Sequence, residues 1–474
     1  MSTAVSVGVR WLAVERGAAW HTALAGRRVT VVGLARSGTA ACRLLCALGA
    51  EVTGTDVRPA EALGGEMRAL AELGVRLYLG GHPLEALSDA ELCVASPGVP
   101  VEHEVLALCR RRGVPVIGEL ELAYRTTTAD VIAVTGTNGK TTTTALVAAL
   151  VGGERRPVLV GGNIGRPLTA QVAGFPADGL VVAEVSSFQL ETIETFRPRV
   201  AALLNLTPDH LDRHRSFEAY REAKARIFMR QTREDWAVVN ADDPEAAGLV
   251  ARAPGRVVWF SRTRAVPEGA FLRNGWVTLR LDGRERPVCP VGEILLRGAH
   301  NLENVLAASA CAAWVGVDPQ TLRGAIRAFR GVAHRLEWVR ELGGVSFYND
   351  SKGTNVDATL KALGAFREPL VLIAGGRDKG QSFAALAGAA SGRVKAAVLI
   401  GEGRATLGPA LRKTTTVREA ESMRDAVRCA VALAVPGDVV LLSPACASFD
   451  MFRDYEHRGE VFKQEVLALE GQRR

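Results

Sequence analysis

Residues 134–144 read VTGTNGKTTTT, and this stretch decides how the middle of the chain folds. It joins an apolar run, VIAVTG, to a helix-forming run, TTTTALVAALV. A glycine-rich turn between a strand and a helix points backbone N–H groups and the helix N-terminus at a bound anion. Gly136 and Gly139 are only three residues apart, so the loop is a shortened relative of the G-x-x-x-x-G-K-[ST] phosphate loop. With Lys140 and Thr141 next in order, the stretch predicts a site for nucleotide phosphates.

The chain around this loop is long enough for about three domains of ordinary size. Its 474 residues are 48% hydrophobic and 23% charged, which favours folded domains over disorder. Apolar strands alternate with helical runs, so we expect an α/β fold with three consecutive α/β domains. These are a Rossmann-like N-terminal domain, a central domain resembling phosphate-loop ATPases and a Rossmann-like C-terminal domain, over residues 1–128, 129–331 and 332–474. The loop then opens the central domain, and each flanking domain can deliver a different substrate to it.

The first domain opens with RRVTVVGLARSGTAACRLLCALGAEVTGTD, which predicts a strand, a glycine turn, a helix and a second strand ending at Asp56. Gly33, Ala35 and Gly38 follow the dinucleotide-binding pattern except for its middle glycine. A UDP-type diphosphate or uridine is therefore favoured over NAD. The turn PGVP at 97–100 follows another strand, LCVAS, at the end where α/β proteins usually hold ligands.

The later domains show the same alternation. LVVAEVSS and VAALLNL read as strands of a parallel sheet, the Asn-Gly pair in FLRNGWVTLRLDG (271–283) predicts a hairpin, and HNLENVLAASACAAWVGV predicts a closing helix. In the third domain we expect strands at VSFYND, LVLIAGG, AAVLIG and VVLLSPA, and helices at ATLKALGAF and FDMFRDYEHRGEVFKQEVLAL.

Composition indicates which kinds of binding partner and which cellular compartment to expect for this protein. The net charge is +7 and the pI about 9.1, but the basic residues are scattered, so we expect polyanionic small molecules as partners and no nucleic acid. No run of 18 apolar residues exists, and Arg10 and Glu15 interrupt what would be a signal-peptide core. We therefore expect a cytoplasmic protein without membrane insertion. The eight cysteines form no C-x-x-C pair, which favours reduced, buried thiols over zinc or disulfides.

Lysine is rare, with eight lysines against fifty arginines. A lysine inside a motif of such a chain indicates chemistry that needs an amine rather than a guanidinium. Four of the eight, Lys140, Lys224, Lys352 and Lys379, lie in motifs.

Polar residues follow the strands that flank the loop. Glu184 ends LVVAEVSS, in the position of the carboxylate that holds Mg²⁺ in phosphate-loop enzymes, with Thr141 as the hydroxyl ligand. The alternative is a solvated glutamate at a strand end. His210, in NLTPDHLDRH, and Lys224, in YREAKARIF, lie downstream of the same sheet, and each could instead be structural or solvated.

The motifs GTNGKT, GGNIG, EVSSFQLETI, NLTPDHLDRH, AKARIF, GAHNLEN, HRLE, NDSKGTN, GGRDKG and SPACASFDMFRDYEHRG occur in this order. Together they are similar to those of the Mur ligase family, over nearly the whole chain. The third-domain motifs resemble those of the family member that adds D-glutamate. The D-N-P-R stretch expected of the diaminopimelate-adding member is absent from the sequence.

The resemblance implies ATP-driven amide formation, in which the carboxylate of UDP-MurNAc-L-alanine is phosphorylated and the amine of D-glutamate attacks the acyl phosphate. It implies that Lys140 neutralises the transferring phosphoryl group, that Thr141 and Glu184 hold one Mg²⁺, and that His210 helps to bind a second. Lys224 matches a lysine that the family carbamylates and would be a further metal ligand. The catalytic residues would be Lys140, Glu184, His210 and Lys224.

The remaining site residues are also implied by the resemblance. The ATP site would consist of Gly136, Thr137, Asn138, Gly139, Lys140, Thr141, Thr142, Asn301, Asn304, Arg335 and Asp350. The UDP-sugar site would consist of Arg36, Ser37, Asp56 and Asn163. The D-glutamate site would consist of Lys352, Thr354, Lys379, Ser448 and Tyr455.

Other functions fit parts of the sequence. Folylpolyglutamate synthase is a related enzyme that also adds glutamate, but SPACASFD and the Rossmann-like first domain argue against it. A phosphate-loop ATPase that binds nucleic acid, or a dinucleotide-binding module without catalysis, are alternatives from other classes. Two features depart from the family pattern, namely Ala35 in place of a glycine and a longer arm before Val29. We expect a monomer, and a structural role for Cys446, because the acyl-phosphate mechanism needs no thiol nucleophile.

Overall fold

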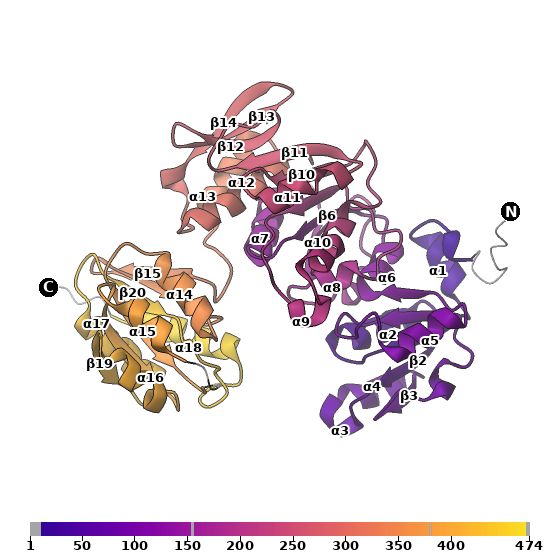
Figure 1. The fold of residues 1–474 in the computed structure, drawn as a ribbon, viewed down its shortest axis with the longest axis horizontal. Helices are drawn as coiled ribbons and strands as arrows, with labels where there is room; N and C mark the ends of the chain where they lie inside the picture. The colour runs from indigo at the N-terminus through magenta and orange to yellow at the C-terminus, as the bar shows by residue number, and fades with distance from the viewer. Residues whose placement is uncertain (1–10, 153–155, 379, 381, 471–474) are drawn as a thin grey trace. The chain divides into compact units, whose positions relative to one another are not determined.

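The structure is a computed structural model that describes residues 11–152, 156–378, 380 and 382–470. Three sheets, each with helices between its strands, make up the fold, which confirms the predicted α/β class (Figure 1). Contacts divide the chain into two compact units, Met1–Val291 with Glu303–Ile326, and Gly292–Leu302 with Arg327–Arg474. The first two sheets belong to the first unit and the third sheet to the second. The domain boundaries at 128/129 and 331/332 remain a prediction.

The N-terminal sheet has five parallel strands in the order β3-β2-β1-β4-β5. The strands are β1 (Arg28–Val32), β2 (Glu51–Asp56), β3 (Arg76–Leu79), β4 (Leu92–Ala95) and β5 (Val116–Gly118). The helices are α1 (Ala18–Leu24), α2 (Arg36–Ala47), α3 (Ala60–Leu63), α4 (Glu66–Glu72), α5 (Glu104–Arg111) and α6 (Glu119–Thr126). The strand order reverses between β1 and β4, where open α/β sheets bind ligands at the carboxyl edge.

The central sheet has nine strands in the order β14-β13-β12-β11-β10-β9-β6-β8-β7. Its parallel strands are β6 (Asp130–Thr135), β7 (Val158–Gly162), β8 (Leu180–Glu184), β9 (Val200–Leu203), β10 (Trp236–Asn240), β11 (Arg256–Ser261) and β12 (Gly269–Arg273). Its helices are α7 (Lys140–Val151), α8 (Ser187–Leu190), α9 (Leu211–His214), α10 (Phe217–Ala225), α11 (Pro244–Gly248), α12 (Ala299–Ala313) and α13 (Pro319–Ala328).

An antiparallel extension completes this sheet with β13 (Trp276–Leu281) and β14 (Arg284–Pro290). The hairpin predicted at 271–283 is confirmed, because β12 and β13 are joined by Asn274 and Gly275 with φ of 51° and 76°. Two consecutive positive φ angles suit the Asn-Gly pair and the twist of a tight hairpin.

The second unit holds a six-stranded sheet in the order β15-β16-β20-β17-β18-β19. The strands are β15 (Glu337–Leu342), β16 (Val345–Asn349), β17 (Leu370–Gly375), β18 (Val394–Ile400), β19 (Thr416–Glu419) and β20 (Val439–Leu442), with only the β15–β16 pair antiparallel. The helices are α14 (Val356–Gly364), α15 (Ala384–Ala390), α16 (Arg404–Leu411), α17 (Met423–Leu433) and α18 (Tyr455–Leu467).

The helix expected from Phe449 onward begins only at Tyr455, so that prediction is wrong at its start. The Asp454 carboxylate accepts a hydrogen bond from the His457 N–H at 2.6 Å and caps the helix there. The backbone of an N-cap residue is extended rather than helical, so the helix cannot continue back past Asp454.

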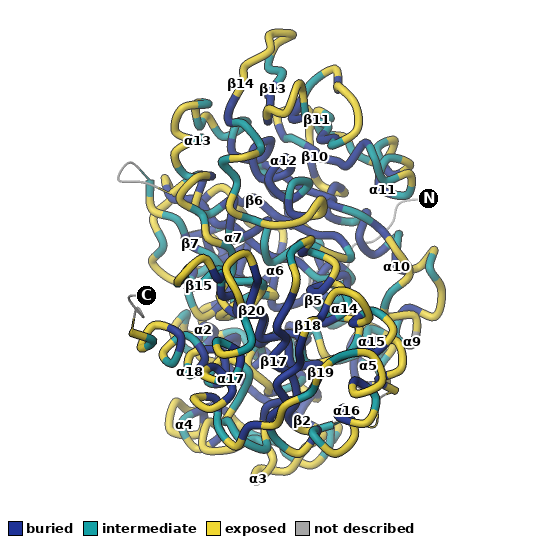
Figure 2. The backbone as a smooth tube through the Cα atoms, turned by 90° about the vertical axis from the view of Figure 1, so that its left-hand side faces the viewer, coloured by how far each residue is buried: buried dark blue, intermediate teal, exposed yellow. Residues whose placement is uncertain are grey.

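The sheets form the cores of both units. Figure 2 shows β6, β17 and β20 in the colour of buried residues, as expected of parallel strands covered on both faces. All eight cysteines are free in the structure, and six of them are buried. Within the described parts of the chain, no helix combines the length and apolar character needed to cross a membrane.

Residues 11–28, the described part of the arm before Val29, pack against α6, the helix that links the first two sheets. Trp20 is fully buried and stacks on Trp11 with ring centroids 5.8 Å apart. Arg125 of α6 lies over the Trp20 ring at 5.0 Å and donates to the Leu12 carbonyl at 2.7 Å. The arm therefore forms part of the core of the first unit.

Candidate active site

The phosphate loop lies between β6 and α7, at the carboxyl edge of the central sheet. Gly136 and Gly139 have φ of 150° and 83°, which side-chain-bearing residues rarely adopt. A Cβ on Gly139 would lie 2.3 Å from Oδ1 of Asn304, a residue of α12. Asn304 also accepts a hydrogen bond from the Thr143 hydroxyl at 3.2 Å, so α12 completes the wall of the loop.

Two residues that the sequence did not single out hold the loop in place. The Asn205 side chain accepts from the Asn138 N–H at 2.8 Å and donates to the Asn138 carbonyl at 3.1 Å. The Tyr220 hydroxyl lies 2.9 Å from the Thr137 hydroxyl. Asn205 is the first residue of the NLTPDHLDRH motif. Its position directly after a strand is the feature of the sequence that could have indicated a role at the loop.

Two predicted lysines meet at one backbone oxygen. Lys140 Nζ and Lys224 Nζ both donate to the Gly136 carbonyl, at 2.8 and 2.9 Å. Lys224 is only 1% exposed. Its burial, and secondly the charge of Lys140, lower the pKa of the Lys224 amine to about 7. A substantial neutral fraction of this amine is therefore present near neutral pH. Thr141 and Thr142, at the start of α7, are half-buried beside Lys140.

Glu184 lies at the end of β8, next to the β6 strand that leads into the loop. The side chain is buried, and its Oε1 accepts from Asn163 Nδ2 at 2.8 Å. Its Oε2 is buried and has no hydrogen-bond partner within the described residues. An unpartnered carboxylate oxygen beside a phosphate loop fits a hard cation such as Mg²⁺. The described part of the chain contains no group of three or more His, Cys, Asp or Glu side chains that could hold a metal ion.

His210 lies on the segment that follows β9, and its φ of 52° places the backbone in the left-handed region. Its ring is half exposed and lies 5.0 Å from the ring of Phe188. Its Nε2 is 3.6 Å from the Asp209 carboxylate. The contacts of Phe188 join the EVSSFQLETI motif to the NLTPDHLDRH motif.

The predicted nucleotide-sugar residues gather at the carboxyl edge of the N-terminal sheet. Asp56 accepts hydrogen bonds from the Leu34 N–H at 2.6 Å and from the Arg58 guanidinium at 2.9 and 3.0 Å. Burial acts to raise the pKa of Asp56, but the bonds from Arg58 and Leu34 outweigh it and hold the pKa at about 2. Arg36 reaches across to the Gly165 carbonyl of the GGNIG loop. Arg58 was missed, although it is two residues beyond Asp56.

Asn163 was expected near the sugar. In the structure Asn163 instead contacts Glu184. Its side chain donates to the Glu184 carboxylate, and its backbone N–H donates to the Glu184 carbonyl at 2.8 Å. Ser37 lies at the start of α2, half-buried, beside Arg36.

The predicted D-glutamate residues all belong to the second unit, and the structure describes each of them except Lys379. Lys352 Nζ lies 5.4 Å from the Tyr455 ring centroid, and Thr354 follows it in the same turn with its N–H bonded to the Lys352 carbonyl. Ser448 is buried at the end of the SPACAS loop. Burial and the neighbouring Glu456 raise the pKa of Tyr455 to about 12. Lys379 lies outside the described residues.

A buried arginine that sequence reasoning missed joins these segments. Arg458 of α18 donates to the Ser351 carbonyl at 2.8 Å, and to the carbonyls of Cys446 and Ala447 at 3.1 and 3.2 Å. Ser351 precedes Lys352, and Ala447 precedes Ser448. Arg458 thereby fixes two of the predicted binding segments against each other. Its burial lowers its pKa to about 10.

The other predicted ATP residues of the second unit have their own partners. Asn301 donates to the Arg297 carbonyl at 2.7 Å. Asp350 accepts from the Ser443 hydroxyl at 2.7 Å, and burial raises its pKa to about 7. Arg335 is exposed beside it and acts to lower that pKa.

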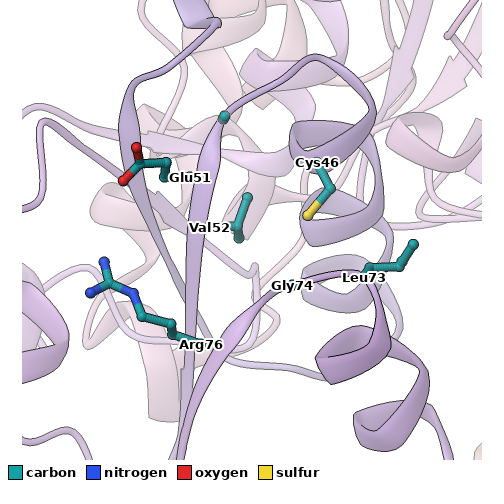
Figure 3. A pocket seen from close by; sticks show the side chains of 7 residues that line it. Cys46, Glu51, Val52, Leu73, Gly74 and Arg76 are labelled. Atoms are coloured by element: carbon teal, nitrogen blue, oxygen red, sulfur yellow. The ribbon is translucent and has the colours of Figure 1, made fainter.

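A surface pocket of about 310 Å³ lies at the amino end of the N-terminal sheet. Figure 3 shows Glu51 and Arg76, the first residues of β2 and β3, with Cys46 and Leu73 on its wall. Because it lies at the strand ends opposite to Asp56, it is separate from the predicted nucleotide-sugar site.

Comparison with known proteins agrees with this geometry. The family models "Mur ligase MurD-like, N-terminal domain", "Mur ligase middle domain" and "Mur ligase, glutamate ligase domain" match residues 27–118, 134–312 and 334–446. Proteins named UDP-N-acetylmuramoylalanine–D-glutamate ligase from Acidobacterium capsulatum and Pelotomaculum thermopropionicum are 49% and 47% identical, over 94% of this chain and 98% of theirs.

The chain belongs to the Mur ligase family.

Solved structures of other Mur ligases share the fold. MurC from Thermotoga maritima is 20% identical, with a TM-score of 0.56 over 93% of this chain and 99% of that one. MurF from Acinetobacter baumannii is 16% identical, with a TM-score of 0.56 over 81% of this chain and 87% of that one. At these identities the likeness concerns the fold of this Mur ligase alone.

Proposed function

We propose that this Mur ligase couples ATP cleavage to formation of an amide between the carboxylate of UDP-N-acetylmuramoyl-L-alanine and the amine of D-glutamate. The product would serve peptidoglycan precursor synthesis in the cytoplasm, and the enzyme would act as a monomer. The names of relatives at 47–49% identity support the substrates. The observation that carries the chemistry is the meeting of Lys140 and Lys224 at the Gly136 carbonyl, beside the unpartnered oxygen of Glu184.

In the first step, a carboxylate oxygen of the substrate attacks the γ-phosphorus of ATP, and ADP leaves. Lys140 balances the charge of the transferring phosphoryl group, and the start of α7 directs N–H groups at the phosphates. In the second step, the D-glutamate nitrogen attacks the acyl carbon, phosphate leaves, and the nitrogen loses a proton. The ADP-bound structure of MurF from Thermotoga maritima shows a nucleotide in a protein of this fold.

Mg²⁺ fits the site, since Glu184 Oε2 and the Thr141 hydroxyl are oxygen donors of the kind it prefers. The ion would neutralise negative charge that develops during phosphoryl transfer. A second ion would use His210 together with Lys224. A neutral Lys224 amine can add to CO₂ and lose a proton, which yields a carbamate whose oxygens could bind the metal. The lowered pKa of Lys224 supports this, because a protonated amine cannot make that bond.

We assign the nucleotide-sugar to the carboxyl edge of the N-terminal sheet, around Asp56, Arg36 and Ser37. The restraint of Arg58 by Asp56 supports this assignment, because a guanidinium held in a fixed orientation at a sheet crevice suits a diphosphate. We assign D-glutamate to the second unit, where the ammonium of Lys352 suits a carboxylate and Ser448 offers a hydroxyl.

Phosphate release measured with UDP-N-acetylmuramoyl-L-alanine and each amino acid in turn tests the proposal. We expect release with D-glutamate, and none above background with L-glutamate or the other amino acids. Release stimulated by a polynucleotide, or by a folate with L-glutamate, would instead favour one of the alternative functions.

A further inference from the structure

Arg213 joins the central sheet to the N-terminal sheet. It lies on α9, and its Nη2 donates to the Val99 carbonyl at 3.2 Å, in the PGVP turn that follows β4. The same Nη2 lies 3.4 Å from the Glu191 carboxylate, and the guanidinium carbon lies 4.8 Å from the ring centroid of Phe188. One side chain thus contacts three segments that are distant in sequence.

The environment of Arg213 is unusual for a residue that only fills space. Its side chain is 16% exposed, and its Nε is buried without a hydrogen-bond partner within the described chain. A buried, partly unsatisfied guanidinium costs free energy that an apolar side chain of similar size would not. What the guanidinium adds is a charged nitrogen, Nη2, whose two hydrogens can be shared by two acceptors on different segments.

The partners of Arg213 are also the partners of the predicted catalytic segment. The Phe188 ring lies 5.0 Å from the His210 ring and stacks on the His214 ring at 5.3 Å. Glu191 also lies 3.3 Å from Nδ1 of His214. His210, Arg213 and His214 are therefore held on one platform, made of Phe188 and Glu191.

On its other side, Arg213 contacts the predicted nucleotide-sugar site. The turn of Val99 packs on the glycine turn after β1, where a Cβ on Gly33 would lie 2.9 Å from Val99 Cγ2. The Ser96 hydroxyl donates to the Gly33 carbonyl at 2.6 Å, and the Val99 N–H to the Ser96 carbonyl at 3.0 Å. A ligand that orders the turn after β1 therefore also orders the Val99 carbonyl.

We propose that Arg213 is a positioning residue that couples the nucleotide-sugar site of the N-terminal sheet to His210 and the phosphate loop. This inference rests on the proposed function. Binding of the nucleotide-sugar fixes the PGVP turn, the turn fixes Arg213, and Arg213 fixes the platform that carries His210. The nucleotide-sugar and ATP therefore bind with positive cooperativity. This cooperativity requires that Arg213 contact both the Val99 carbonyl and the Glu191 carboxylate.

The test measures the affinity of a non-hydrolysable ATP analogue with Mg²⁺ by calorimetry, with and without saturating UDP-N-acetylmuramoyl-L-alanine. In the wild type we expect the nucleotide-sugar to tighten analogue binding about fivefold or more. In Arg213→Gln the ratio falls to about one, while the affinity of the analogue alone stays within about threefold, since the substitution removes the link rather than the site. A purely structural role would lower both affinities together.

Arg110→Gln is the matched control. Arg110 donates to the Val101 carbonyl of the same turn at 2.6 Å, but it comes from α5 of the N-terminal sheet itself. This variant should keep the wild-type ratio. If Arg213→Gln does not fold, Arg213→Lys decides, because a lysine retains the charge but its side chain is one bond shorter than the path to Nη2, so the variant should lose at least half of the cooperativity.

A wild-type ratio near one overturns the proposal, as does a wild-type ratio in Arg213→Gln or a lost ratio in Arg110→Gln. A separate titration of the nucleotide-sugar alone identifies failure of the proposed function, because the nucleotide-sugar would then not bind the wild type at all.

Discussion

Lys224 reaches the Gly136 carbonyl from α10, 88 residues further along the chain. We predict that Lys224→Arg leaves the protein folded but lowers turnover to less than about a tenth, which corresponds to about 1.4 kcal/mol of lost transition-state stabilisation. Arginine keeps the positive charge but cannot form a carbamate. Ligase assays with circular dichroism on the variant check this.

The matched control is Lys361→Arg, because Lys361 pairs with Asp357 on the exposed face of α14. Exposed pairs of this kind contribute little, so the control should retain wild-type turnover. A folded Lys224→Arg enzyme with more than about a tenth of wild-type activity would falsify the carbamate assignment.

The same residue makes stability depend on pH. The pKa of Lys224 is about 7 in the folded protein and 10.5 for a lysine exposed to solvent, so the unfolded chain binds an extra proton between these values. The free energy of unfolding should therefore rise as pH rises from 7 toward 10.5. Below pH 7 the contribution of Lys224 to this free energy no longer changes with pH. Relative to Lys224→Met, the wild type should gain about 2 kcal/mol between about pH 7.5 and 9.5. Denaturant unfolding in CO₂-free buffer measures this, and parallel pH profiles for the two proteins would contradict it.

At the scale of elements, the phosphate loop depends on glycine for two separate reasons. Gly139 has a positive φ, and a Cβ there would also meet Asn304 of α12 at 2.3 Å. We predict that Gly139→Ala weakens binding of an ATP analogue about tenfold or more, because the positive φ is strained and the loop or the Asn304 side chain must shift. At Gly113, whose φ is 74° and whose Cβ would meet nothing within 4 Å, alanine adds only backbone strain of about 1 kcal/mol. Gly113→Ala should therefore bind the analogue normally in calorimetry, and equal losses in both variants would refute the argument.

Local patterns predicted the elements that local forces specify. The loop, the strand before it and the Asn-Gly hairpin follow from glycine conformation and apolar periodicity within a few residues. The start of α18 was wrong because 449–454 has helix-compatible residues, and the deciding contact is the cap from Asp454 to His457. Capping is also local, so this error could have been avoided by weighing the Asp454 position.

The candidate site was predicted only in part, because its remaining residues act over long sequence distances. Lys224 could be named from its motif, but its burial and its shared carbonyl with Lys140 could not. Arg213 and Arg458 make their contacts 114 and 107 residues away, and nothing in their neighbouring sequence indicates which backbone carbonyls they meet. Side chains that join distant segments are visible only once the fold is assembled.

At the scale of the whole molecule, residues 11–28 of the arm before Val29 stabilise the first unit through α6. Trp20→Ala removes a fully buried ring and should cost about 3–5 kcal/mol. We expect calorimetric unfolding of the first unit at a lower temperature, with the transition of the second unit unchanged. Trp276→Ala, at a ring that is 36% exposed on β13, is the control and should cost about 1 kcal/mol or less. Equal destabilisation by both variants would show that the arm has no special role.

The hydrogen bond between Thr143 and Asn304 also has a consequence in time, because it spans 161 residues. At about 5–20 residues per second, a ribosome needs about 8–30 seconds to make the chain between them. All strands of the N-terminal sheet, by contrast, lie within residues 28–118 and are synthesised before the loop. A nascent chain can therefore complete its first sheet before the loop is made, whereas the wall formed by Asn304 is added only after the whole central sheet has been synthesised. The complete loop wall therefore becomes available for nucleotide only after the N-terminal sheet and the central sheet have been synthesised.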